Sequence, residues 1–569
     1  MKLRHIAAYT GLGLLLMAGL AYANRVTVMQ YSLGWLTDLR YPREAYRPVP
    51  WASGPETVGG TAPATATAPP GQQEQKGQKR PPNIIVILAD DLGFNDVTTH
   101  GGGYAALGVS TPHIDSIARD GVRFEQGYAG SAICTPSRAA LLTGRYPWRF
   151  GLEFTPTPGA MARIGPKLLA DPRLPHQPVF DEAVAAQAKN FNELGMPPTE
   201  QTVGKLLQAR GYHTLHIGKW HLGSTPQMRP NNQGFDESLF MESGLYLPQN
   251  SPDVVNSKQD FDPLDRFFWP NFRFGVSYNG GKWFEPNKYL TDYFTDEAVA
   301  AIQKNKNQPF FMYLAHWGVH TPLQAAKADY DALAHIPNHR MRVYGAMIRS
   351  VDRSVGRILQ TLKDQGLDDN TIVIFTSDNG APGYLGIPDV NKPYRGWKLT
   401  LFEGGVRVPF VAKWPGHIPA GLHYQPPVSS IDILPTVVAA AGGTLPTDRV
   451  VDGVNVLPFL QDAKRVQAER PLFWRDGPYR AMQEGGWKLI VAERPKKNWL
   501  FHLKTDPTER TNLAAQQPEK LAQMLAALKA HHANMPPSLW ASFLEMPVAI
   551  DKTLDQAQTA DDEYTYWVN

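Results

Sequence analysis

The run Asn83-Ile84-Ile85-Val86-Ile87-Leu88-Ala89 decides the fold of this chain. Every residue after Asn83 is apolar, and such a near-continuous run predicts a central parallel strand that is covered on both faces. Asp90 and Asp91 follow it directly. Two aspartates after a strand are commonly a turn or a helix cap, so their meaning depends on what neighbouring strands bring to the same edge.

Three further predicted strands also end in polar residues. Strands are predicted at 213–217, 310–315 and 371–375, and helices at 200–210 and 347–362. The polar residues that follow these strands include Lys219, His221, His316, His320, Asp378 and Asn379. Parallel strands need crossover connections, which are mostly helical, and open α/β sheets bind ligands beyond the carboxyl ends of their strands. We therefore predict an α/β fold with a doubly wound, mostly parallel sheet flanked by helices.

Each polar group has an ordinary structural explanation when it is taken alone. The run Asp378-Asn379-Gly380 is a strong tight-turn signal. Single histidines such as His221 and His320 are mostly satisfied polar residues without a catalytic role. Their joint occurrence after four predicted strands is what favours a functional site.

Cys134 is the only cysteine among 569 residues, so the chain has no intrachain disulfide. A lone cysteine is most often a small buried hydrophobe. Here Pro136, Ser137 and Arg138 follow it, and the apolar run 139–142 predicts a helix that begins nearby. A helix N-terminus offers unpaired N–H groups and a positive dipole end, which suit an anionic substrate.

The run from Cys134 to Arg138 resembles the Cys-x-Pro-Ser-Arg signature of the type I sulfatases, which belong to the alkaline phosphatase superfamily. The resemblance extends over approximately Pro82 to Ala514. It implies that a formylglycine-generating enzyme oxidises Cys134 to formylglycine (3-oxoalanine), whose hydrate carries two hydroxyls on one carbon. The first hydroxyl would attack the sulfur of a sulfate ester, and the second would expel sulfate. A serine could perform only the first of these steps.

The same resemblance assigns roles to the polar residues at the strand ends. Arg138 would support the hydrate, His320 would protonate the departing alcohol, and His221 would take the proton from the second hydroxyl. The residues implied to bind sulfate are Lys219 and Lys398, and those implied to hold a metal are Asp90, Asp91, Cys134, Asp378 and Asn379. Carboxylate and amide oxygens favour a hard cation, for which we expect calcium in preference to magnesium. The three basic residues would offset the charge of the carboxylates and of an arriving sulfate ester.

These observations predict a sulfuric ester hydrolase of the arylsulfatase type, acting on a sulfated small molecule or glycan. The nearest alternative is a phosphonate or phosphate monoester hydrolase on the same fold. A non-catalytic binder of sulfated glycans is a further alternative. The chain has 56 basic and 53 acidic residues without a strong polybasic block, so nothing in its charge points to nucleic acid as a partner.

The first residues predict export. Lys2 and Arg4 precede an apolar run, Ile6 to Ala23, that ends in Ala21-Tyr22-Ala23, a small-x-small pattern suited to signal peptidase. The run is also close to the length of a membrane helix, so an uncleaved N-terminal membrane anchor stays open. We expect a periplasmic or extracellular protein, or one anchored in the inner membrane by this segment.

Four regions are expected along the chain. They are a signal peptide or anchor (1–23), a flexible linker (24–82), a sulfatase catalytic domain (83–462) and a C-terminal subdomain with a tail (463–569). In the last region, short strands are predicted at 472–474, 479–482 and 487–491, followed by a helix with an apolar stripe from Leu521 to Leu528. The aromatic-rich stretch 230–290 is either a local core or a wall of the substrate pocket.

Overall fold

The computed structural model describes residues 42–54, 80–102, 104–157, 172, 174–242, 244–462 and 464–569. The predicted signal peptide or anchor lies outside these residues, as does most of the predicted linker. Within the described ranges, no helix combines the length and the apolar character that crossing a membrane requires.

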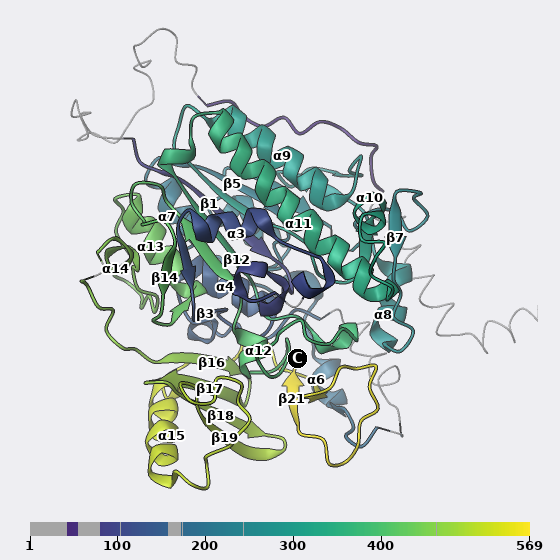
Figure 1. Cartoon of the computed structure of the whole chain (residues 1–569), viewed down its shortest axis with the longest axis vertical. Helices are drawn as coiled ribbons and strands as arrows, with labels where there is room; N and C mark the ends of the chain where they lie inside the picture. Colours follow the sequence, from purple (N-terminus) through teal and green to yellow (C-terminus); the bar gives the residue numbers. More distant parts are fainter. Residues whose placement is uncertain are drawn as a thin grey trace, which may run out of the picture.

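A ten-stranded mixed sheet forms the centre of the molecule (Figure 1). In spatial order its strands are β14 (Leu422–Tyr424), β2 (Val122–Phe124), β13 (Phe410–Lys413), β12 (Thr371–Ser377), β1 (Asn83–Ala89), β10 (Phe310–Ala315), β5 (His213–Gly218), β6 (Glu237–Met241), β8 (Val276–Tyr278) and β9 (Trp283–Phe284). The four predicted strands are neighbours and run parallel, with Ile85 in register between Met312 and Val373. Antiparallel pairs occur only toward the two edges. The α/β prediction is therefore confirmed.

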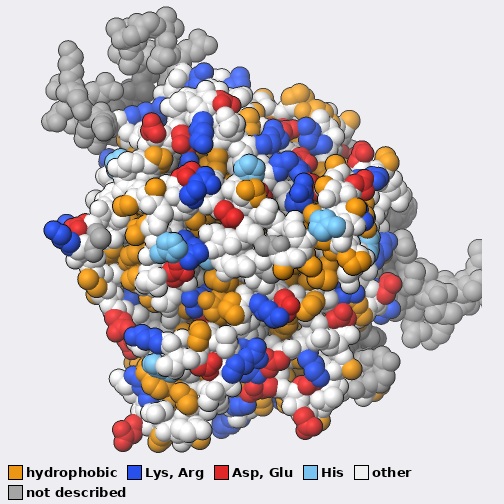
Figure 2. All heavy atoms as spheres, viewed as in Figure 1, with side chains coloured by type: hydrophobic (Ala, Val, Ile, Leu, Met, Phe, Trp, Pro, Cys, Tyr) orange, Lys and Arg blue, Asp and Glu red, His pale blue; other side chains and the backbone are white. Residues whose placement is uncertain are grey.

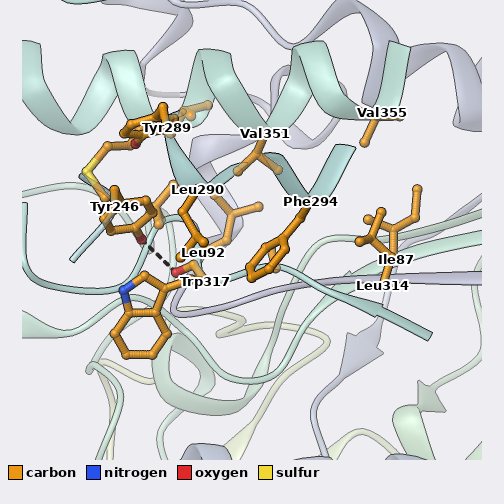
Figure 3. Close-up of a cluster of buried hydrophobic side chains, with 14 of the residues drawn as sticks. Ile87, Leu92, Tyr246, Tyr289, Leu290, Phe294, Leu314, Trp317, Val351 and Val355 are labelled. Atoms are coloured by element: carbon orange, nitrogen blue, oxygen red, sulfur yellow. Dashed lines mark hydrogen bonds between the residues drawn. The ribbon is translucent and has the colours of Figure 1, made fainter. Parts of the chain in front are cut away.

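Helices cover both faces of this sheet because β1 buries alternate side chains on opposite sides. Ile85 and Ile87 face a core shared with α3 (Pro112–Arg119), α9 (Leu290–Asn305) and α11 (His339–Asp364). Figure 3 shows part of this core, in which Leu290 and Phe294 of α9 and Val351 of α11 pack near Trp317. Ile84 and Val86 face a second core, which is covered by α4 (Cys134–Thr143), α7 (Val203–Gln208) and α13 (Ile433–Ala440).

Two predicted helices have different ends in the structure. Helix α11 begins eight residues before the predicted 347, because the Asn338 side chain caps it by accepting the Met341 N–H. Helix α7 is shorter than the predicted 200–210, and Thr202 caps it by accepting the Lys205 N–H. The remaining described elements are β3 (Gly127–Tyr128), α6 (Glu182–Ala186), β7 (Val254–Asn256), α8 (Pro263–Phe268), β11 (Gln324–Ala326), α10 (Lys327–Asp331), α12 (Glu403–Val406), β15 (Val428–Ser429), α14 (Leu457–Gln461) and eleven short 3-10 turns.

The C-terminal region forms a second, smaller layer. Strands β16 (Leu472–Asp476), β17 (Tyr479–Glu484), β18 (Trp487–Glu493) and β19 (Lys496–His502) make an antiparallel sheet. Gly485 and Gly486 form the hairpin turn between β17 and β18, both with positive φ, as such a turn requires. Helix α15 (Pro518–His532) packs on this sheet through buried Met524 and Leu528. Strand β19 was not predicted, since its polar first half hides the alternation of its apolar residues.

The tail of the chain returns to the region that contains the large sheet. Strands β20 (Leu544–Ala549) and β21 (Tyr564–Val568) pair with each other, and β20 also pairs with β4 (Val179–Phe180), far away in sequence. In Figure 1 the C-terminus lies beside α12, between the large sheet and the small one. The tail, which carried no sequence signal, is thus part of the surface close to the sheet's functional edge.

Residues 42–54 belong to the predicted linker but pack against β9 and α9. Glu44 bridges to Phe284 of β9, and the buried Trp51 donates its indole N–H to Glu297 at 2.8 Å. The aromatic-rich stretch contributes Trp269, Phe274 and Phe284 to the core, which favours the local-core interpretation for these residues. On the face in Figure 2, basic and acidic side chains are interspersed.

Candidate active site

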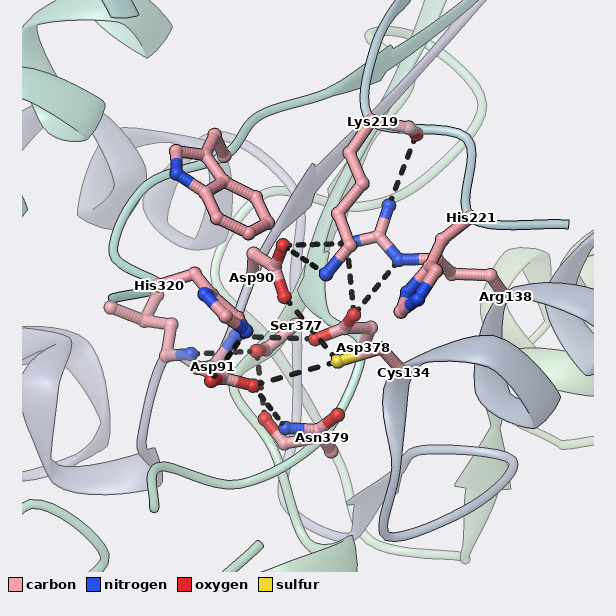
Figure 4. A network of polar contacts seen from close by, with 12 residues as sticks. Asp90, Asp91, Cys134, Arg138, Lys219, His221, His320, Ser377, Asp378 and Asn379 are labelled. Atoms are coloured by element: carbon pink, nitrogen blue, oxygen red, sulfur yellow. Dashed lines mark hydrogen bonds and ion pairs between the residues drawn. The ribbon is translucent and has the colours of Figure 1, made fainter. Parts of the chain in front are cut away.

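The polar residues predicted at the four strand ends converge at one place (Figure 4). Asp90 and Asp91 follow β1, Lys219 and His221 follow β5, His320 follows β10, and Asp378 and Asn379 follow β12. Cys134 and Arg138 reach the same place from the first turns of α4. Lys398 comes from the loop after residue 390 and binds Asp91. Sequence reasoning found these residues, and the structure brings all of them together.

Cys134 is the first residue of α4 and is buried. Its Sγ lies 3.6 Å from Asp90 Oδ1 and 3.8 Å from Asp91 Oδ1. Burial, together with the nearby carboxylate of Asp378, holds the pKa of the thiol well above its usual range. The unmodified side chain is therefore held as the neutral thiol at neutral pH, whereas the thiolate is the reactive form of cysteine.

Asp90 and Asp378 share the guanidinium of Arg138. Arg138 Nη2 lies 2.8 Å from Asp378 Oδ2 and 3.3 Å from Asp90 Oδ2. Lys219 Nζ lies 2.7 Å from that same Asp90 oxygen. Burial raises the pKa of Asp90 to about 7, with Asp378 adding to this shift and the two basic residues opposing it. The cluster is thus held together by charge, at the cost of desolvating it.

Asp91 is the second centre of the cluster. Its Oδ1 lies 2.8 Å from Lys398 Nζ and accepts the Asn379 amide at 2.7 Å. Its Oδ2 lies 3.5 Å from His320 Nε2. Burial acts to raise the pKa of Asp91, but Lys398 and then His320 outweigh it and hold that pKa well below its usual range. Asp91 is therefore an anion throughout the neutral pH range.

Two of the predicted site residues have strained backbones. Asp91 and His221 have φ angles of 61° and 60°, in a region that residues with a Cβ rarely adopt. Gly218, with φ 108°, precedes Lys219, and a Cβ there would lie 2.0 Å from the Ala315 carbonyl oxygen. Such strain persists where the surroundings impose it, and it clusters at functional sites.

Both histidines at the site are held neutral. Burial lowers the pKa of His320 to about 3, with Asp91 opposing and Lys219 and Lys398 reinforcing the shift. Burial and Lys219 hold the pKa of His221 well below its usual range. His320 Nδ1 contacts the Thr321 carbonyl oxygen at 2.6 Å, so it carries the hydrogen and leaves Nε2 facing Asp91. Each imidazole can therefore accept a proton, and an arriving anion would favour its charged form.

The donor set fits a divalent cation. Single ligand atoms of Asp90, Asp91, Cys134 and His320 all lie within 4.8 Å of one another. Asn379 donates its amide to Asp91, and within the described residues its buried Oδ1 has no hydrogen-bond partner. Asp378 uses Oδ1 to accept the Asp91 N–H at 3.2 Å and Oδ2 to bind Arg138. The oxygen-rich set suits a hard ion such as calcium or magnesium.

The sequence did not reveal three aromatic residues that line the same site. Trp317 stacks on the His320 ring and lies under Lys219 Nζ, 4.7 Å from the ring centre. Tyr246 donates its hydroxyl to the carbonyl oxygens of Trp317 and His320. Tyr384 donates its hydroxyl to Asp91 Oδ2 at 3.3 Å. These residues lie in loops without a motif, so only the three-dimensional structure identifies them. His316, by contrast, is buried and contacts Ser354, away from the cluster.

A cavity of about 670 Å³ lies elsewhere, between the sheet edge and the C-terminal hairpin. Arg123 and Tyr394 line it from the catalytic domain, and Gln483 and Lys504 line it from the small sheet. None of the predicted site residues lines it. The charge cluster, rather than this hollow, therefore marks the candidate active site.

Comparison with known proteins gives concordant results. The family model described as Sulfatase matches residues 82–443, and a second model, N-sulphoglucosamine sulphohydrolase C-terminal, matches residues 396–535. Human N-acetylgalactosamine-6-sulfatase is 32% identical over 505 residues, which cover 81% of this chain and 88% of the relative. The crystal structure of Ps i-CgsB in complex with k-i-k-neocarrahexaose superposes with a TM-score of 0.67 at 30% identity, covering 81% of this chain and 95% of that one.

A more distant neighbour relates to the alternative prediction. The phosphonate monoester hydrolase of Agrobacterium radiobacter has a TM-score of 0.53 at 19% identity and covers 79% of this chain and 96% of its own. At that identity the likeness shows a shared fold alone.

Proposed function

The chain belongs to the sulfatase family and hydrolyses sulfate esters, and from that premise we propose that Cys134, matured to formylglycine, is the nucleophile of a calcium-dependent enzyme acting on sulfated saccharides. The observation that supports this most strongly is that charged side chains from separate parts of the chain converge on Cys134. Three carboxylates and three basic side chains surround its Sγ in a buried cluster at the N-terminus of α4. Such an arrangement suits an anion that reacts at residue 134.

The proposed reaction divides the work between two groups of residues. Lys219 and Lys398 would bind the sulfate oxygens, since each already contacts a carboxylate oxygen that a sulfate oxygen resembles. One hydroxyl of the hydrated residue 134 attacks sulfur and gives its proton to a neighbouring carboxylate, for which Asp90 Oδ1, 3.6 Å from Cys134 Sγ, is placed. His320, charged once the anion has arrived, protonates the departing alcohol oxygen from Nε2. His221 then takes the proton of the second hydroxyl as sulfate leaves and the aldehyde returns. An acid for bond cleavage and a base for breakdown are both required.

Calcium is the cation that we propose for this site, held by Asp90, Asp91, Asp378, Asn379 and residue 134. When bound, it would supply Lewis-acid polarisation of the sulfate group and neutralise the carboxylates. A chelator should therefore remove activity and lower the unfolding temperature of the matured enzyme, and calcium should restore both. In Asp91→Asn the calcium-dependent rise in unfolding temperature should be absent. If the unfolding temperature of the wild type did not change when calcium was added, this metal assignment would be ruled out.

Maturation of Cys134 is tested by mass. Trypsin cuts after Arg123 and after Arg138, so residue 134 lies in the peptide 124–138. When the chain is produced with a formylglycine-generating enzyme, this peptide should have the mass of the aldehyde, which is lower than that of the thiol. Active protein with an intact thiol would overturn the proposed nucleophile.

A sulfated saccharide is the substrate class that we propose, because the N-acetylgalactosamine-6-sulfatases are 32–35% identical to this chain and the steryl-sulfatases 30–32%. The human relative is named for a sulfated amino sugar, and the Ps i-CgsB structure holds a carrahexaose. Hydrolysis of sulfated mono- and oligosaccharides should therefore exceed that of steroid sulfates in kcat/KM. Side-by-side kinetics with phosphonate and phosphate monoesters would identify the alternative enzyme class, if those esters proved the better substrates.

Export is proposed on the basis of the N-terminal segment. The apolar run after Lys2 and Arg4 and its small-x-small end favour a periplasmic or extracellular enzyme. The N-terminal sequence of protein purified from the producing cells separates the two outcomes. A mature chain that begins near Asn24 indicates a cleaved signal, and an intact Met1 in a membrane fraction indicates an anchor.

A further inference from the structure

The carboxylate of Asp91 is crowded by neighbouring polar side chains, and the Tyr384 hydroxyl is a long contact among them. Oδ1 contacts Asn379 at 2.7 Å and Lys398 at 2.8 Å. Oδ2 contacts Lys398 at 2.9 Å, the Tyr384 hydroxyl at 3.3 Å and His320 Nε2 at 3.5 Å. A carboxylate offers about four lone-pair sites, so the long Tyr384 contact is a weak one. The hydroxyl therefore lies in the site with only a weak hydrogen bond to Asp91, and it can donate to a ligand instead.

Tyr384 lies partly at the surface and partly in the charge cluster. Its ring is half-buried, while its hydroxyl reaches the buried charge cluster. Lys398 Nζ lies 5.9 Å from the centre of the Tyr384 ring, so the two side chains line the same side of the site. A neutral phenol near an ammonium group provides a second, directional donor for an anion that the ammonium attracts.

The turn that carries Tyr384 is held from two sides. It is a 3-10 turn, Gly383–Leu385, followed by Gly386 with φ 62°. Arg340, from the first turn of α11, donates to the Gly386 carbonyl oxygen at 2.8 Å. The Leu554 N–H of the C-terminal tail donates to the Gly383 carbonyl oxygen at 3.0 Å. Asp555 completes the support through its ion pair with Arg340 at 3.0 Å.

The same tail also supports the loop that carries Lys398. Arg395 Nε, three residues before Lys398, donates to Asp551 Oδ1 at 2.8 Å. Glu563 contacts the same guanidinium from the other end of the tail loop. Residues 550–563 therefore hold both Tyr384 and Lys398 in place.

We propose that Tyr384 is a further substrate-contacting residue, whose hydroxyl donates a hydrogen bond to the sulfate group bound beside Lys398. We also assign Asp555, in the tail, as a positioning residue for it. This inference rests on the proposed active site, since it uses Lys398 as a sulfate ligand. It gives the C-terminal tail a part in substrate binding that no sequence motif indicates.

The decisive experiment uses Tyr384→Phe in the matured full-length chain, because phenylalanine keeps the ring and removes only the hydroxyl. Inorganic sulfate is the probe. Its inhibition constant and the KM for an aryl sulfate should both rise roughly tenfold, the scale of one hydrogen bond to a charged group, while kcat changes less than about twofold. An unchanged inhibition constant in a variant with wild-type unfolding temperature would overturn the proposal.

A second variant tests the role of the tail. Asp555→Ala should raise the inhibition constant of sulfate in the same direction by roughly two- to threefold, as expected for losing a partly exposed ion pair. It should have no further effect in the Tyr384→Phe background, because both changes act through one hydroxyl. Asp561→Ala, at an exposed position of the same tail loop, is the matched control and should leave the constant unchanged. If Asp555→Ala lowered only the unfolding temperature, the positioning role would be wrong.

The failure of this inference is distinguishable from the failure of the proposed function. If the wild-type chain carries the aldehyde but hydrolyses no sulfate ester, the proposed active site is wrong. If the wild type is active and binds sulfate as tightly as Tyr384→Phe does, only the assignment of Tyr384 falls.

Discussion

Two buried charge clusters in this molecule are built from similar residues but serve different purposes. The catalytic cluster comprises Asp90, Asp91, Asp378, Arg138, Lys219 and Lys398. The interdomain cluster comprises Glu403 and Arg407 of the catalytic domain, Lys488 and Glu509 of the C-terminal region, and Tyr128. Formal charges cancel in both, three against three and two against two, so net charge does not distinguish them.

The interdomain cluster is closed. Lys488 Nζ lies 2.8 Å from Glu403 Oε1 and 3.0 Å from Glu509 Oε1. Glu403 Oε2 accepts from the Tyr128 hydroxyl at 2.9 Å and from Arg407 at 3.1 Å. Glu509 also accepts the Glu403 N–H at 2.7 Å. Each charged group thus has an opposite partner, and the cluster joins the small sheet to α12.

The catalytic cluster is open. Within the described residues, the buried Asn379 Oδ1 and His221 Nδ1 lack hydrogen-bond partners. In the interdomain cluster Arg407 Nε also lacks one, but every carboxylate and every cation there has an ion-pair partner. Its neighbours His221 and His320 are only partly buried, whereas Glu403, Lys488 and Glu509 are fully buried. Asp91 and His221 also hold strained φ angles. A partly exposed cluster with strained residues is organised to receive a ligand, whereas a buried, paired cluster stabilises the fold.

The largest expected effect is the loss of turnover when Cys134 is replaced. In Cys134→Ala and Cys134→Ser we expect turnover to fall on the order of 10⁴-fold or more, because neither variant can form an aldehyde hydrate. The unfolding free energy should change little, since the thiol is a neutral group in an open cluster. Activity of matured wild type and variants on an aryl sulfate gives the measurement. Undiminished hydrolysis by the serine variant would refute the two-hydroxyl mechanism.

Removing the centre of the closed cluster should act on stability instead. Lys488→Met leaves Glu403 and Glu509 buried without their shared cation, and we expect a loss of about 4 kcal/mol in the free energy of unfolding. Activity per folded molecule should stay at the wild-type level, because the side chain is remote from residue 134. Urea denaturation, followed by kinetics on the folded fraction, separates the two effects. A stable variant with reduced kcat would show that the two clusters are coupled.

The matched change in the open cluster is Lys219→Met. We expect kcat/KM for a sulfate ester to fall roughly a hundredfold, as when one donor to a developing anion is removed. The destabilisation should be smaller than that of Lys488→Met, because Arg138 still lies 3.3 Å from Asp90. Lys219→Met should therefore lose mainly activity, and Lys488→Met should lose mainly stability. Kinetics and urea denaturation of both variants give the measurement. Equal destabilisation by both variants would remove the distinction between the clusters.

The open cluster was predictable from the sequence, and the closed one was not. Asp90 and Asp91 follow a strand whose apolar run fixes its place in the sheet, and Cys134 lies in a signature run, so local patterns lead directly to the site. Lys488 and Glu403 are 85 positions apart and lie in no motif. Their pairing depends on how the small sheet docks on α12, which periodicity does not encode.

The same reasoning explains the misplaced boundaries and the missed residues. The start of α11 depends on a side-chain cap at Asn338, and the apolar pattern from Met347 onward could not locate it. Tyr384 is placed by Arg340 and by Leu554 from the tail, two segments that sequence reasoning left unconnected. Strand periodicity thus predicted the sheet and its edge, while long-range polar contacts decided which loops complete the site.

The smallest expected effect is a pH dependence of the unfolding free energy that arises from Glu509 in the interdomain cluster. Burial raises the pKa of Glu509 to about 7, with Lys488 opposing this shift and Glu403 adding to it. The folded chain therefore keeps a proton that the unfolded chain loses near its ordinary value of 4.5. This contribution to stability is fully present below pH 4.5, declines as the pH rises, and is gone above about pH 7. Between pH 5 and pH 8 the free energy of unfolding should fall by roughly 2 kcal/mol more in the wild type than in Glu509→Gln. Urea denaturation of both proteins at the two pH values gives the measurement. If the variant lost as much stability as the wild type between these values, Glu509 would be ionised in the fold, and the interdomain cluster would be held by two full negative charges rather than one.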